Sequence, residues 1–507
     1  MDEAMNRRQF LKRSAITAGM AAFPLSFSRW GAAQSEISAK PRPNVLLIIT
    51  DDQRWDTMSC MGNAILKTPA LDRLAAGGVL FRNSFVTTST CAPSRASIMT
   101  GKYVHTNGVW SIGKPIPQDQ RTIFEILQGN GYYTGHVGKW HMTPVRRGFV
   151  PEEHRRGIAD WRGIGAFMPY IHDDGQHHIE WETEQVLDFL NTRPKDRPFV
   201  LTVGIQAPHS PHIPKPKHEH LFEDVTIPPP PFAQEGFDRV PDPVKNSGGR
   251  AAWNKHIPTH ELYQEYVKNY YRQIVGVDEA VGRILDALDR QELTDSTLVI
   301  FISDNGYFLG EHGLAEKWFP YEEGLRVPLI IRYPPITDAR KGSVVDAQAL
   351  NIDIAPTILQ TVGLDVPSDV QGMSLVPLLA SSEEDVHWRT SWLYEYACPS
   401  GVPPVEAVRT QRWKYIIYMG ADSSVEELFD LERDPREIND LSQSPDHRDV
   451  LDRMRAEHAK LRRETDYDFW GTHPKNTNPL WKEWQNQRKA RKKVPRTGED
   501  SAEEPAK

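Results

Sequence analysis

Five segments of the chain are continuous apolar runs of strand length, and they are separated by segments with helical spacing. The first run, NVLLIIT at residues 44–50, ends at two aspartates. Continuous apolar runs of this length are typical of strands that are buried on both faces. The other four runs lie at residues 132–141, 198–209, 296–306 and 327–334. The pattern therefore predicts five buried strands.

The intervals between these runs predict helices. TPALDRLAAGG, at residues 68–78, ends at glycines, as helices often do. Apolar residues recur at helical spacing in 122–132, in 181–193 and, over the longest stretch, in 261–293. Alternating strands and helices predict an α/β fold with a large, doubly wound, mostly parallel sheet flanked by helices. We place this domain at residues 41–382.

Three regions depart from the alternation. Residues 226–258 are rich in proline and glycine and show no clear period, which predicts a long irregular loop that is either functional or disordered. Residues 383–475 contain short β-rich segments with turns and then a helical segment, which predicts a smaller antiparallel-sheet subdomain. Residues 476–507 are first basic and then acidic, with no apolar residues able to pack, and are predicted to be disordered.

The N-terminal residues 1–33 resemble a twin-arginine signal. Arg7 and Arg8 are followed by Phe10, Leu11 and Lys12 and then by a weakly apolar stretch. The stretch is too short and interrupted to span a bilayer, so we expect an export address and no stable membrane insertion. The protein is expected in the periplasm or outside the cell. A basic amphipathic N-terminal helix is the alternative.

Charge, cysteine content and aromatic content indicate which kinds of partner the protein could have. The net charge of −8 over 507 residues does not favour a nucleic-acid partner. The chain has three cysteines, too few for a disulfide scaffold; Cys60 and Cys398 could pair, but we expect two isolated thiols. The 39 prolines and 14 tryptophans suit a loop-rich surface with exposed aromatic platforms, as in many proteins that bind carbohydrate.

Polar residues follow four of the predicted strands. Each alone could be a turn or cap residue or a solvated side chain, but ligands of open α/β sheets bind beyond the carboxyl ends of the strands. All of these residues should therefore meet at one edge of the sheet. They are Asp51, Asp52, Lys139, His141, His209, Asp304 and Asn305.

The chemistry of these side chains indicates an ester substrate. The aspartates and the asparagine offer only oxygen ligands, which suit Ca²⁺ or Mg²⁺ and not zinc. The neighbouring lysine and histidines offer positive charge for an anion. A hard divalent cation beside cationic side chains makes a site for phosphate or sulfate esters.

The segment CAPSRASIMTGKY, residues 91–103, resembles the signature of the type I sulfatases, which is Cys-x-Pro-Ser-Arg followed by Thr-Gly. Along the chain, the segments TDDQRWD before it and GKWH, QAPHSPH, SDNGYFLGEHGLAEKW and ELFDLERDP after it occur in the order of that family. The resemblance covers residues 41–445. It implies an alkaline-phosphatase-like fold, with a large α/β domain and a smaller C-terminal one.

The resemblance also implies a role for Cys91. In the family this cysteine is oxidised to formylglycine by a formylglycine-generating enzyme, and Pro93 and Arg95 belong to the sequence that the enzyme reads. One oxygen of the hydrated aldehyde attacks sulfur, and the second allows sulfate to leave as the aldehyde re-forms. A buried structural cysteine is the alternative.

Further roles follow from the same resemblance. One Ca²⁺ ion would be bound by Asp51, Asp52, Asp304, Asn305 and the modified Cys91.

The catalytic side chains are assigned in the same way. Arg95 would orient the hydrated aldehyde, Lys139 would bind a sulfate oxygen, and His141 would accept the proton that triggers sulfate release. His209 would protonate the leaving alcohol, and Lys317 would share that work.

The expected substrate is a sulfated polysaccharide or its oligosaccharides. Candidate substrate contacts, each of which could equally be a packing or solvated residue, are His172, Asp173, His212, Arg250, Trp253, Lys255, His256 and His312. Two alternatives are a phosphate or phosphonate ester hydrolase of the same fold and a non-catalytic glycan-binding protein in which Cys91 is never modified.

Overall fold

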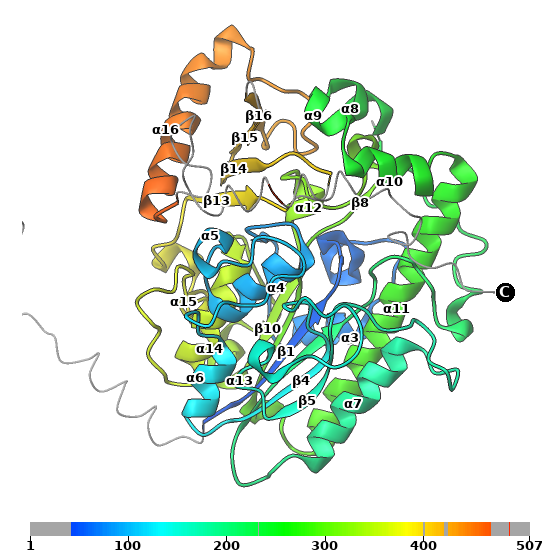
Figure 1. Ribbon diagram of the computed structural model, residues 1–507, viewed down its shortest axis with the longest axis vertical. Helices are drawn as coiled ribbons and strands as arrows, with labels where there is room; N and C mark the ends of the chain where they lie inside the picture. The colour runs from blue at the N-terminus through cyan, green and yellow to red at the C-terminus, as the bar shows by residue number, and fades with distance from the viewer. Residues whose placement is uncertain (1–41, 232, 399–400, 420–423, 468–485, 487–507) are drawn as a thin grey trace, which may run out of the picture. The chain divides into compact units, whose positions relative to one another are not determined.

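The computed structural model describes residues 42–231, 233–398, 401–419, 424–467 and 486, and an eight-stranded sheet lies at the centre of this part of the chain (Figure 1). Its strand order is β11-β2-β10-β7-β1-β6-β4-β5. In that order the strands span Ser343–Val345, Val79–Phe81, Leu329–Arg332, Thr297–Ser303, Asn44–Thr50, Phe199–Ile205, Tyr133–Lys139 and Asp160–Ile164.

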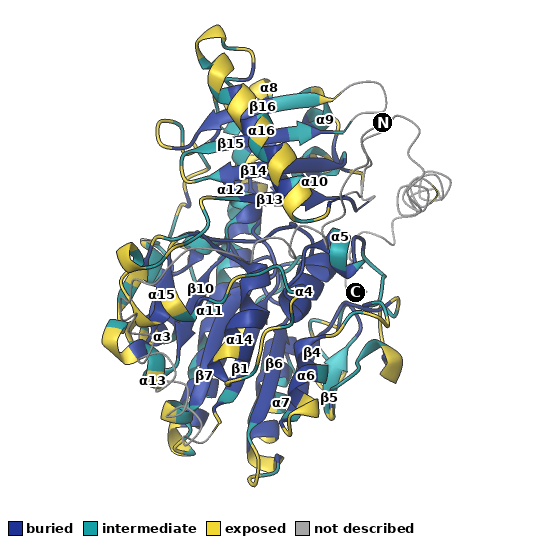
Figure 2. Ribbon diagram, turned by 90° about the vertical axis from the view of Figure 1, so that its left-hand side faces the viewer, coloured by how far each residue is buried: buried dark blue, intermediate teal, exposed yellow. Residues whose placement is uncertain are grey.

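The sheet is mostly parallel, as predicted. Strand β1 lies between β6 and β7 and pairs in parallel with both, and β4 pairs in parallel with β6 and β5. Strand β10 runs antiparallel to β7 and to β2. All five predicted strands are in this sheet, and the central ones are buried along nearly their whole length (Figure 2).

Helices cover both faces of the sheet, so the predicted doubly wound arrangement is confirmed. Along β1, Val45 and Leu47 join the core formed with α4, α6 and α14. Leu46 and Ile48 point the other way, into the core formed with α3, α7 and α11. This alternation is the period of a strand, and it explains why β1 must be apolar at consecutive positions. These helices span Pro69–Ala76 (α3), Cys91–Thr100 (α4), Ile123–Gly129 (α6), His178–Thr192 (α7), His260–Arg290 (α11) and Ile354–Thr361 (α14).

A second sheet is formed by the C-terminal part of the chain. Its strands are antiparallel in the order β13-β14-β15-β16, and α16 packs against them. The predicted antiparallel sheet is therefore confirmed, and it begins at Ser391. The elements span Ser391–Tyr396, Val405–Thr410, Trp413–Tyr418, Val425–Asp430 and Arg448–Glu464. The domain limits at 383 and 475 stay predictions. The predicted signal and, apart from residue 486, the predicted tail lie outside the described residues.

Short elements complete the fold. Two-residue strands pair as β3 with β12 and as β8 with β9. These strands span Ser84–Phe85, Ala349–Leu350, Phe308–Leu309 and Ala315–Glu316. Four of the short helices are α5 (Val104–Asn107), α12 (Glu322–Leu325), α13 (Pro334–Thr337) and α15 (Val376–Ala380). None of the described helices is long and apolar enough to cross a bilayer.

The prediction of an irregular loop at 226–258 is wrong. The described residues of this region form three helices, α8 (Ala233–Arg239), α9 (Asp242–Lys245) and α10 (Gly248–His256). Pro241 is the N-cap of α9, and α10 begins at two glycines, so these breakers lie at helix ends, where they are tolerated. Helix α10 uses Gly249 for close packing, because a Cβ there would lie 2.9 Å from the Phe319 ring.

The structure also tests two expectations about side chains, the pairing of two cysteines and the exposure of aromatic residues. Cys60 and Cys398 are both free, so they do not pair. The expectation of many exposed aromatics is wrong for the described residues, because Phe149 is the one aromatic among the strongly exposed large apolar side chains. The tryptophans at positions 110, 140 and 392 are almost fully buried.

Candidate active site

The polar residues that follow four strands meet at one edge of the main sheet. Strands β1, β4, β6 and β7 are parallel neighbours, so their carboxyl ends lie side by side. The structure brings the strand-end residues together with Cys91 and Arg95 of α4 and with Lys317, which follows β9. Ten predicted residues are thereby gathered: Asp51, Asp52, Cys91, Arg95, Lys139, His141, His209, Asp304, Asn305 and Lys317.

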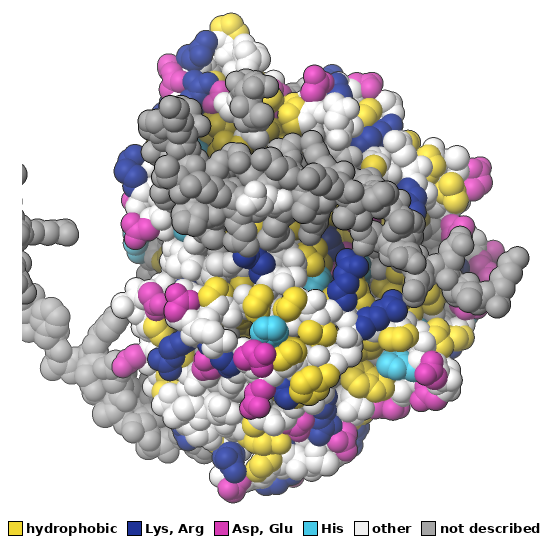
Figure 3. Space-filling model, viewed as in Figure 1, with side chains coloured by type: hydrophobic (Ala, Val, Ile, Leu, Met, Phe, Trp, Pro, Cys, Tyr) yellow, Lys and Arg dark blue, Asp and Glu magenta, His cyan; other side chains and the backbone are white. Residues whose placement is uncertain are grey.

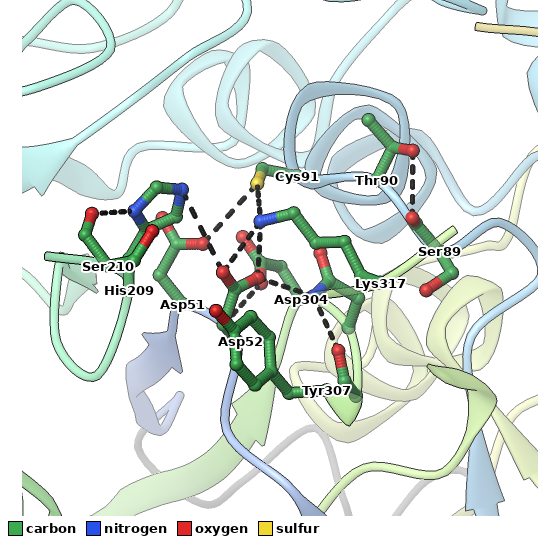
Figure 4. Close-up of polar contacts among 12 residues, drawn as sticks. Asp51, Asp52, Ser89, Thr90, Cys91, His209, Ser210, Asp304, Tyr307 and Lys317 are labelled. Carbon is green, nitrogen blue, oxygen red and sulfur yellow. Dashed lines mark hydrogen bonds and ion pairs between the residues drawn. The ribbon is translucent and has the colours of Figure 1, made fainter. Parts of the chain in front are cut away.

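Cys91 is the first residue of α4, and its thiol points into this cluster (Figure 4). Its Sγ lies 3.3 Å from Asp51 Oδ1 and accepts a hydrogen bond of 3.1 Å from Lys317 Nζ. Burial, together with the charge of Asp51, raises the pKa of the thiol well above its ordinary value. The cysteine as encoded is therefore a protonated, weakly reactive thiol at neutral pH.

The local sequence explains the position of α4. All ten of its residues are buried, and it ends at Gly101 in a left-handed conformation with φ of 70°. A Cβ at Gly101 would lie 2.8 Å from Val370, so glycine is required for both the turn and the packing. The Thr-Gly pair of the signature segment thus closes the helix that carries Cys91 at its other end.

The carboxylates form a site that fits a hard cation. Ligand atoms of Asp51, Asp52, Cys91 and Asp304 all lie within 4.8 Å of one another. The Asn305 Oδ1 atom is buried and has no hydrogen-bond partner. Burial, opposed by Lys317 and reinforced by Asp51 and Asp304, raises the pKa of Asp52 to about 7. The three carboxylates crowd together at this point, and their oxygen donors suit calcium or magnesium.

Three buried cations hold these carboxylates. The Arg95 Nε atom donates to Asp304 Oδ2 at 2.8 Å, and its Nη1 donates to the carbonyl of Lys139 at 2.9 Å. Lys139 itself pairs with Asp51. The Nζ atom of Lys317 lies 2.5 and 2.7 Å from the two carboxylate oxygens of Asp52. Buried charges are tolerated here because each one is paired.

Two histidines, His141 and His209, lie among these charged groups. His209 Nδ1 bonds to the carbonyl of Ser210 at 2.6 Å, and its Nε2 lies 3.8 Å from Asp52 Oδ2. Both ring nitrogens of His141 are buried without a hydrogen-bond partner. Burial, reinforced by the charge of Lys139, holds the pKa of His141 well below its ordinary value. A neutral imidazole is able to accept a proton.

Backbone conformation turns two of these side chains toward the site. Asp52 and His141 both have a φ of 68°, in the left-handed region that residues other than glycine seldom adopt. Such outliers are concentrated at functional sites, where the surrounding structure holds them in place.

Phe167 was not anticipated from the sequence. Its ring lies 4.5 Å from Lys139 Nζ and 5.6 and 5.1 Å from the rings of His141 and His209. It belongs to an irregular segment after β5, outside every motif, so no sequence signal marked it. The aromatic ring restricts water around these three polar groups.

Among the candidate substrate contacts, His212 packs against a tyrosine that bonds to the backbone of Asp52. Its ring packs edge-on against Tyr266 at 4.5 Å and Tyr270 at 5.2 Å. The Tyr270 hydroxyl donates to the carbonyl of Asp52 at 2.7 Å. Both tyrosines come from α11 and were not anticipated, and His256 lies 5.3 Å from the Tyr266 ring.

The other candidates lie in varied surroundings. His312 is buried and stacks on Tyr321 at 4.3 Å, against the core of the second sheet. Arg250 lies 3.7 Å from the ring of Phe237 and 4.0 Å from that of Trp253. His172 stacks on Trp181, whereas Asp173 and Lys255 are exposed. That any of these candidates contacts the substrate stays a prediction.

The site is buried and combines carboxylates, paired cations and the Cys91 side chain at the start of α4. Such a site is suited to hydrolysis of an anionic ester. Comparison with known proteins leads to the same class of reaction. The family model described as Sulfatase matches residues 43–364, and the one described as N-sulphoglucosamine sulphohydrolase, C-terminal, matches residues 310–464. The chain is 31% identical over 467 residues to an N-acetylglucosamine-6-O-sulfatase of Bacteroides thetaiotaomicron, covering 79% of this chain and 82% of that protein. The chain therefore belongs to the sulfatase family and is a sulfuric ester hydrolase.

Solved structures agree with this fold. The structure of BT4656 in complex with its substrate D-glucosamine-2-N,6-O-disulfate has a TM-score of 0.72 and 28% identity, covering 86% of this chain and 100% of that one. A phosphonate monoester hydrolase of Agrobacterium radiobacter has a TM-score of 0.70 and 24% identity, covering 84% of this chain and 96% of that one. The second likeness concerns the fold alone.

Proposed function

We propose that this sulfatase removes sulfate from a sulfated saccharide, with formylglycine made from Cys91 and with a bound calcium ion. The observation that carries the proposal is the position of the Cys91 side chain, which lies at the start of α4 between the carboxylates and Lys317. The saccharide is suggested by the names of two similar proteins, an N-acetylglucosamine-6-O-sulfatase and a protein bound to a disulfated glucosamine.

Formylglycine would supply, as its hydrate, an oxygen nucleophile with a second hydroxyl that lets the sulfated residue break down, which a serine lacks. The residues of the signature are inaccessible in the folded chain, because Cys91, Pro93 and Arg95 are all buried in α4. A formylglycine-generating enzyme would therefore read this segment before the chain folds.

Calcium would be held by Asp51, Asp52, Asp304 and Asn305, with the modified side chain at position 91. It would supply a positive charge that favours ionisation of the nucleophile and offsets charge on the sulfate oxygens. The close approach of the three carboxylates and the unpartnered Asn305 Oδ1 support this assignment.

The chain's own cations would bind and orient the sulfate. Lys139 and Lys317 lie on two sides of the cluster and would each donate to a sulfate oxygen. Arg95, fixed by Asp304 and by the backbone of β4, would keep the residue at position 91 in register. Preorganised donors of this kind stabilise developing charge without reorganisation during the reaction.

Two histidines would move protons. The buried, neutral His141 would accept the proton whose loss breaks down the sulfated intermediate. His209 is the more accessible of the two, with 15% of its side chain exposed, and its imidazolium form would give the Nε2 proton to the oxygen of the leaving alcohol. Burial, reinforced by Lys317, lowers the pKa of His209, so the negative charge of the bound sulfate ester would have to favour that protonated form. Its Nδ1 is already committed to Ser210, so Nε2 is the nitrogen left for substrate.

The test of this function compares three substrates. Wild-type protein is assayed for release of alcohol from a sulfated oligosaccharide, from nitrophenyl sulfate and from a nitrophenyl phosphonate monoester. The proposal predicts hydrolysis of both sulfate esters, and the sulfated oligosaccharide that is cleaved fastest identifies the sugar. Faster hydrolysis of the phosphonate would favour the alternative function, a phosphonate ester hydrolase, whose fold is similar.

We also infer that the protein is exported to the periplasm or beyond the cell, because a sulfated polysaccharide is met there and because residues 1–33 have a twin-arginine pattern. Cell fractionation after replacement of Arg7 and Arg8 by lysine tests this. Unchanged export of the variant would contradict the assignment of the signal.

A further inference from the structure

A short segment beside the active site contacts His209 at two points. This clamp segment, residues 165–170, has the sequence GAFMPY, follows β5 and has no regular secondary structure. Its Phe167 ring lies 5.1 Å from the His209 ring, and its Tyr170 hydroxyl bonds to the backbone of the same histidine. Surface charge does not mark the segment, because the face shown in Figure 3 mixes acidic and basic side chains among the described residues. Its role has to be inferred from its contacts.

The clamp segment is fixed to the end of β6. The side-chain amide of Gln206, the residue that follows β6, accepts a hydrogen bond from the N–H of Met168 at 2.8 Å and donates to the carbonyl of Met168 at 3.2 Å. Gln206 is fully buried, and its own N–H donates to Glu182 Oε1 at 3.0 Å. Buried hydrogen bonds of this kind are costly to break because the groups would be left without partners. The segment therefore keeps a fixed distance from the strand that leads to His209.

Tyr170 is held from the side of α7 as well. Its carbonyl accepts a hydrogen bond of 2.9 Å from the N–H of His178, the first residue of α7, and its ring packs edge-on against the His178 ring at 4.9 Å. Burial, reinforced by the charge of Asp51, raises the pKa of Tyr170 well above its ordinary value. The hydroxyl therefore stays protonated and remains a hydrogen-bond donor.

This hydroxyl bonds to the loop that carries His209. It donates to the carbonyl oxygens of His209 and Ser210, which lie 2.7 and 2.9 Å from it. The carbonyl of Ser210 also accepts from Nδ1 of the His209 ring at 2.6 Å. Because a carbonyl oxygen can only accept, Nδ1 must carry a proton, and Nε2 is the nitrogen left for substrate. The direction of this one carbonyl thus sets which nitrogen of His209 is presented.

We propose that Tyr170 is a positioning residue for the sulfatase reaction, because its hydroxyl fixes the Ser210 carbonyl that orients the His209 ring toward the leaving alcohol. The proposal rests on the proposed function. Tyr170 acts through His209 and does not touch the substrate. The Phe167 ring bounds the same imidazole and limits its rotation. Loss of the Tyr170 hydroxyl should therefore matter most for esters whose leaving alcohol needs a proton.

The test replaces Tyr170 by phenylalanine, which removes the hydroxyl and keeps the ring. Protein that carries formylglycine and calcium is assayed on phenyl sulfate, whose phenolate leaves poorly, and on nitrophenyl sulfate, whose phenolate leaves easily. The kcat for phenyl sulfate should fall about 10-fold, the size of one lost hydrogen bond, with KM unchanged, whereas kcat for nitrophenyl sulfate should fall less than about 2-fold.

The control is Tyr132→Phe, which deletes another tyrosine hydroxyl that donates to a backbone carbonyl. This hydroxyl lies 3.1 Å from the carbonyl oxygen of Pro43, and Tyr132 precedes β4, at the edge of the sheet opposite the site. Both kcat values of this variant should stay within about 2-fold of the wild type, because the lost bond does not reach His209.

A double variant separates positioning from a general structural effect. In the His209→Ala background, Tyr170→Phe should cause no further loss on phenyl sulfate, since the group that it positions is gone. Equal losses on the two substrates for Tyr170→Phe, or a 10-fold loss that persists in the His209→Ala background, would overturn the proposal.

Crystal structures distinguish failure of this inference from failure of the proposed function. If wild-type protein hydrolyses neither sulfate ester, the proposed function fails, and structures of the full chain with Cys91 unmodified decide the positioning. Loss of the contact between His209 Nδ1 and the Ser210 carbonyl in Tyr170→Phe would keep Tyr170 as the residue that orients His209. An unchanged contact in the variant would overturn that role.

Discussion

Replacing Arg95 by methionine removes the guanidinium that ties Asp304 to the backbone of β4. Methionine keeps the apolar stem, so the change mainly deletes two charge-assisted hydrogen bonds, of 2.8 Å to Asp304 and 2.9 Å to the carbonyl of Lys139. Breaking a fully buried ion pair leaves an uncompensated carboxylate and costs about 3–5 kcal/mol. That loss is a large part of the roughly 5–15 kcal/mol that stabilises a typical folded protein.

The control is an arginine that is itself largely exposed and that bonds to both oxygens of one buried carboxylate. Arg412 donates to both oxygens of Asp430, at 2.9 and 2.7 Å, but 42% of its side chain is exposed. Exposed pairs contribute little because water and salt screen them. Urea unfolding with a metal chelator present should therefore show a markedly lower midpoint for Arg95→Met and a smaller decrease for Arg412→Met, because the exposed Arg412 is screened by water although Asp430 is buried. Equal midpoints for the two variants would refute the argument that burial makes the Arg95 pair important.

Three further predictions concern chemistry, metal and pH. His209→Ala should lower kcat/KM about 10²–10⁴-fold more for a sugar sulfate than for nitrophenyl sulfate, because only the sugar alcohol needs a proton to leave, whereas Lys139→Ala should affect both substrates equally; equal losses for His209→Ala would remove it from the acid role. Removing metal by dialysis against a chelator should abolish activity, calcium should restore it, and elemental analysis showing zinc alone would contradict the oxygen-donor site. Burial, reinforced by Arg95, lowers the pKa of His136 to about 3, below the pKa of a histidine in the unfolded chain. The contribution of His136 to the free energy of unfolding is therefore present above about pH 6.5 and is lost as pH falls toward 3. The free energy of unfolding, measured by urea titration, should fall less steeply over that range in His136→Asn, and an unchanged slope would rule out this cause.

Much of the site could be predicted because it depends on strand direction. Asp51, Asp304 and His209 follow apolar runs that could only be buried strands, and parallel neighbours must bring those ends together. The positions of Arg95 and Lys317 could be assigned only through the resemblance to sulfatases. Every residue of α4 is buried, so this helix has no polar face and no amphipathic pattern to detect.

The parts that could not be predicted depend on contacts between distant segments. Phe167 and Tyr270 reach the site from a loop and from the middle of α11, and neither has a local motif. Strand β5, with the sequence DWRGI, lies at the sheet edge and is only partly buried, so it lacks the apolar run of a central strand. Proline and glycine between 226 and 258 indicated a loop, whereas the fold places Pro241, Gly248 and Gly249 at the starts of short helices.

The central claim is that a modified Cys91 carries the sulfatase reaction, and one measurement tests it directly. Protein produced with and without a formylglycine-generating enzyme is digested, the peptide containing residue 91 is weighed by mass spectrometry, and release of inorganic sulfate from nitrophenyl sulfate is measured on the same samples. Our account predicts that sulfate release rises in proportion to the fraction of peptide that carries formylglycine, and that Cys91→Ala, which keeps the fold, releases none. Full activity in protein whose residue 91 is wholly cysteine would contradict it.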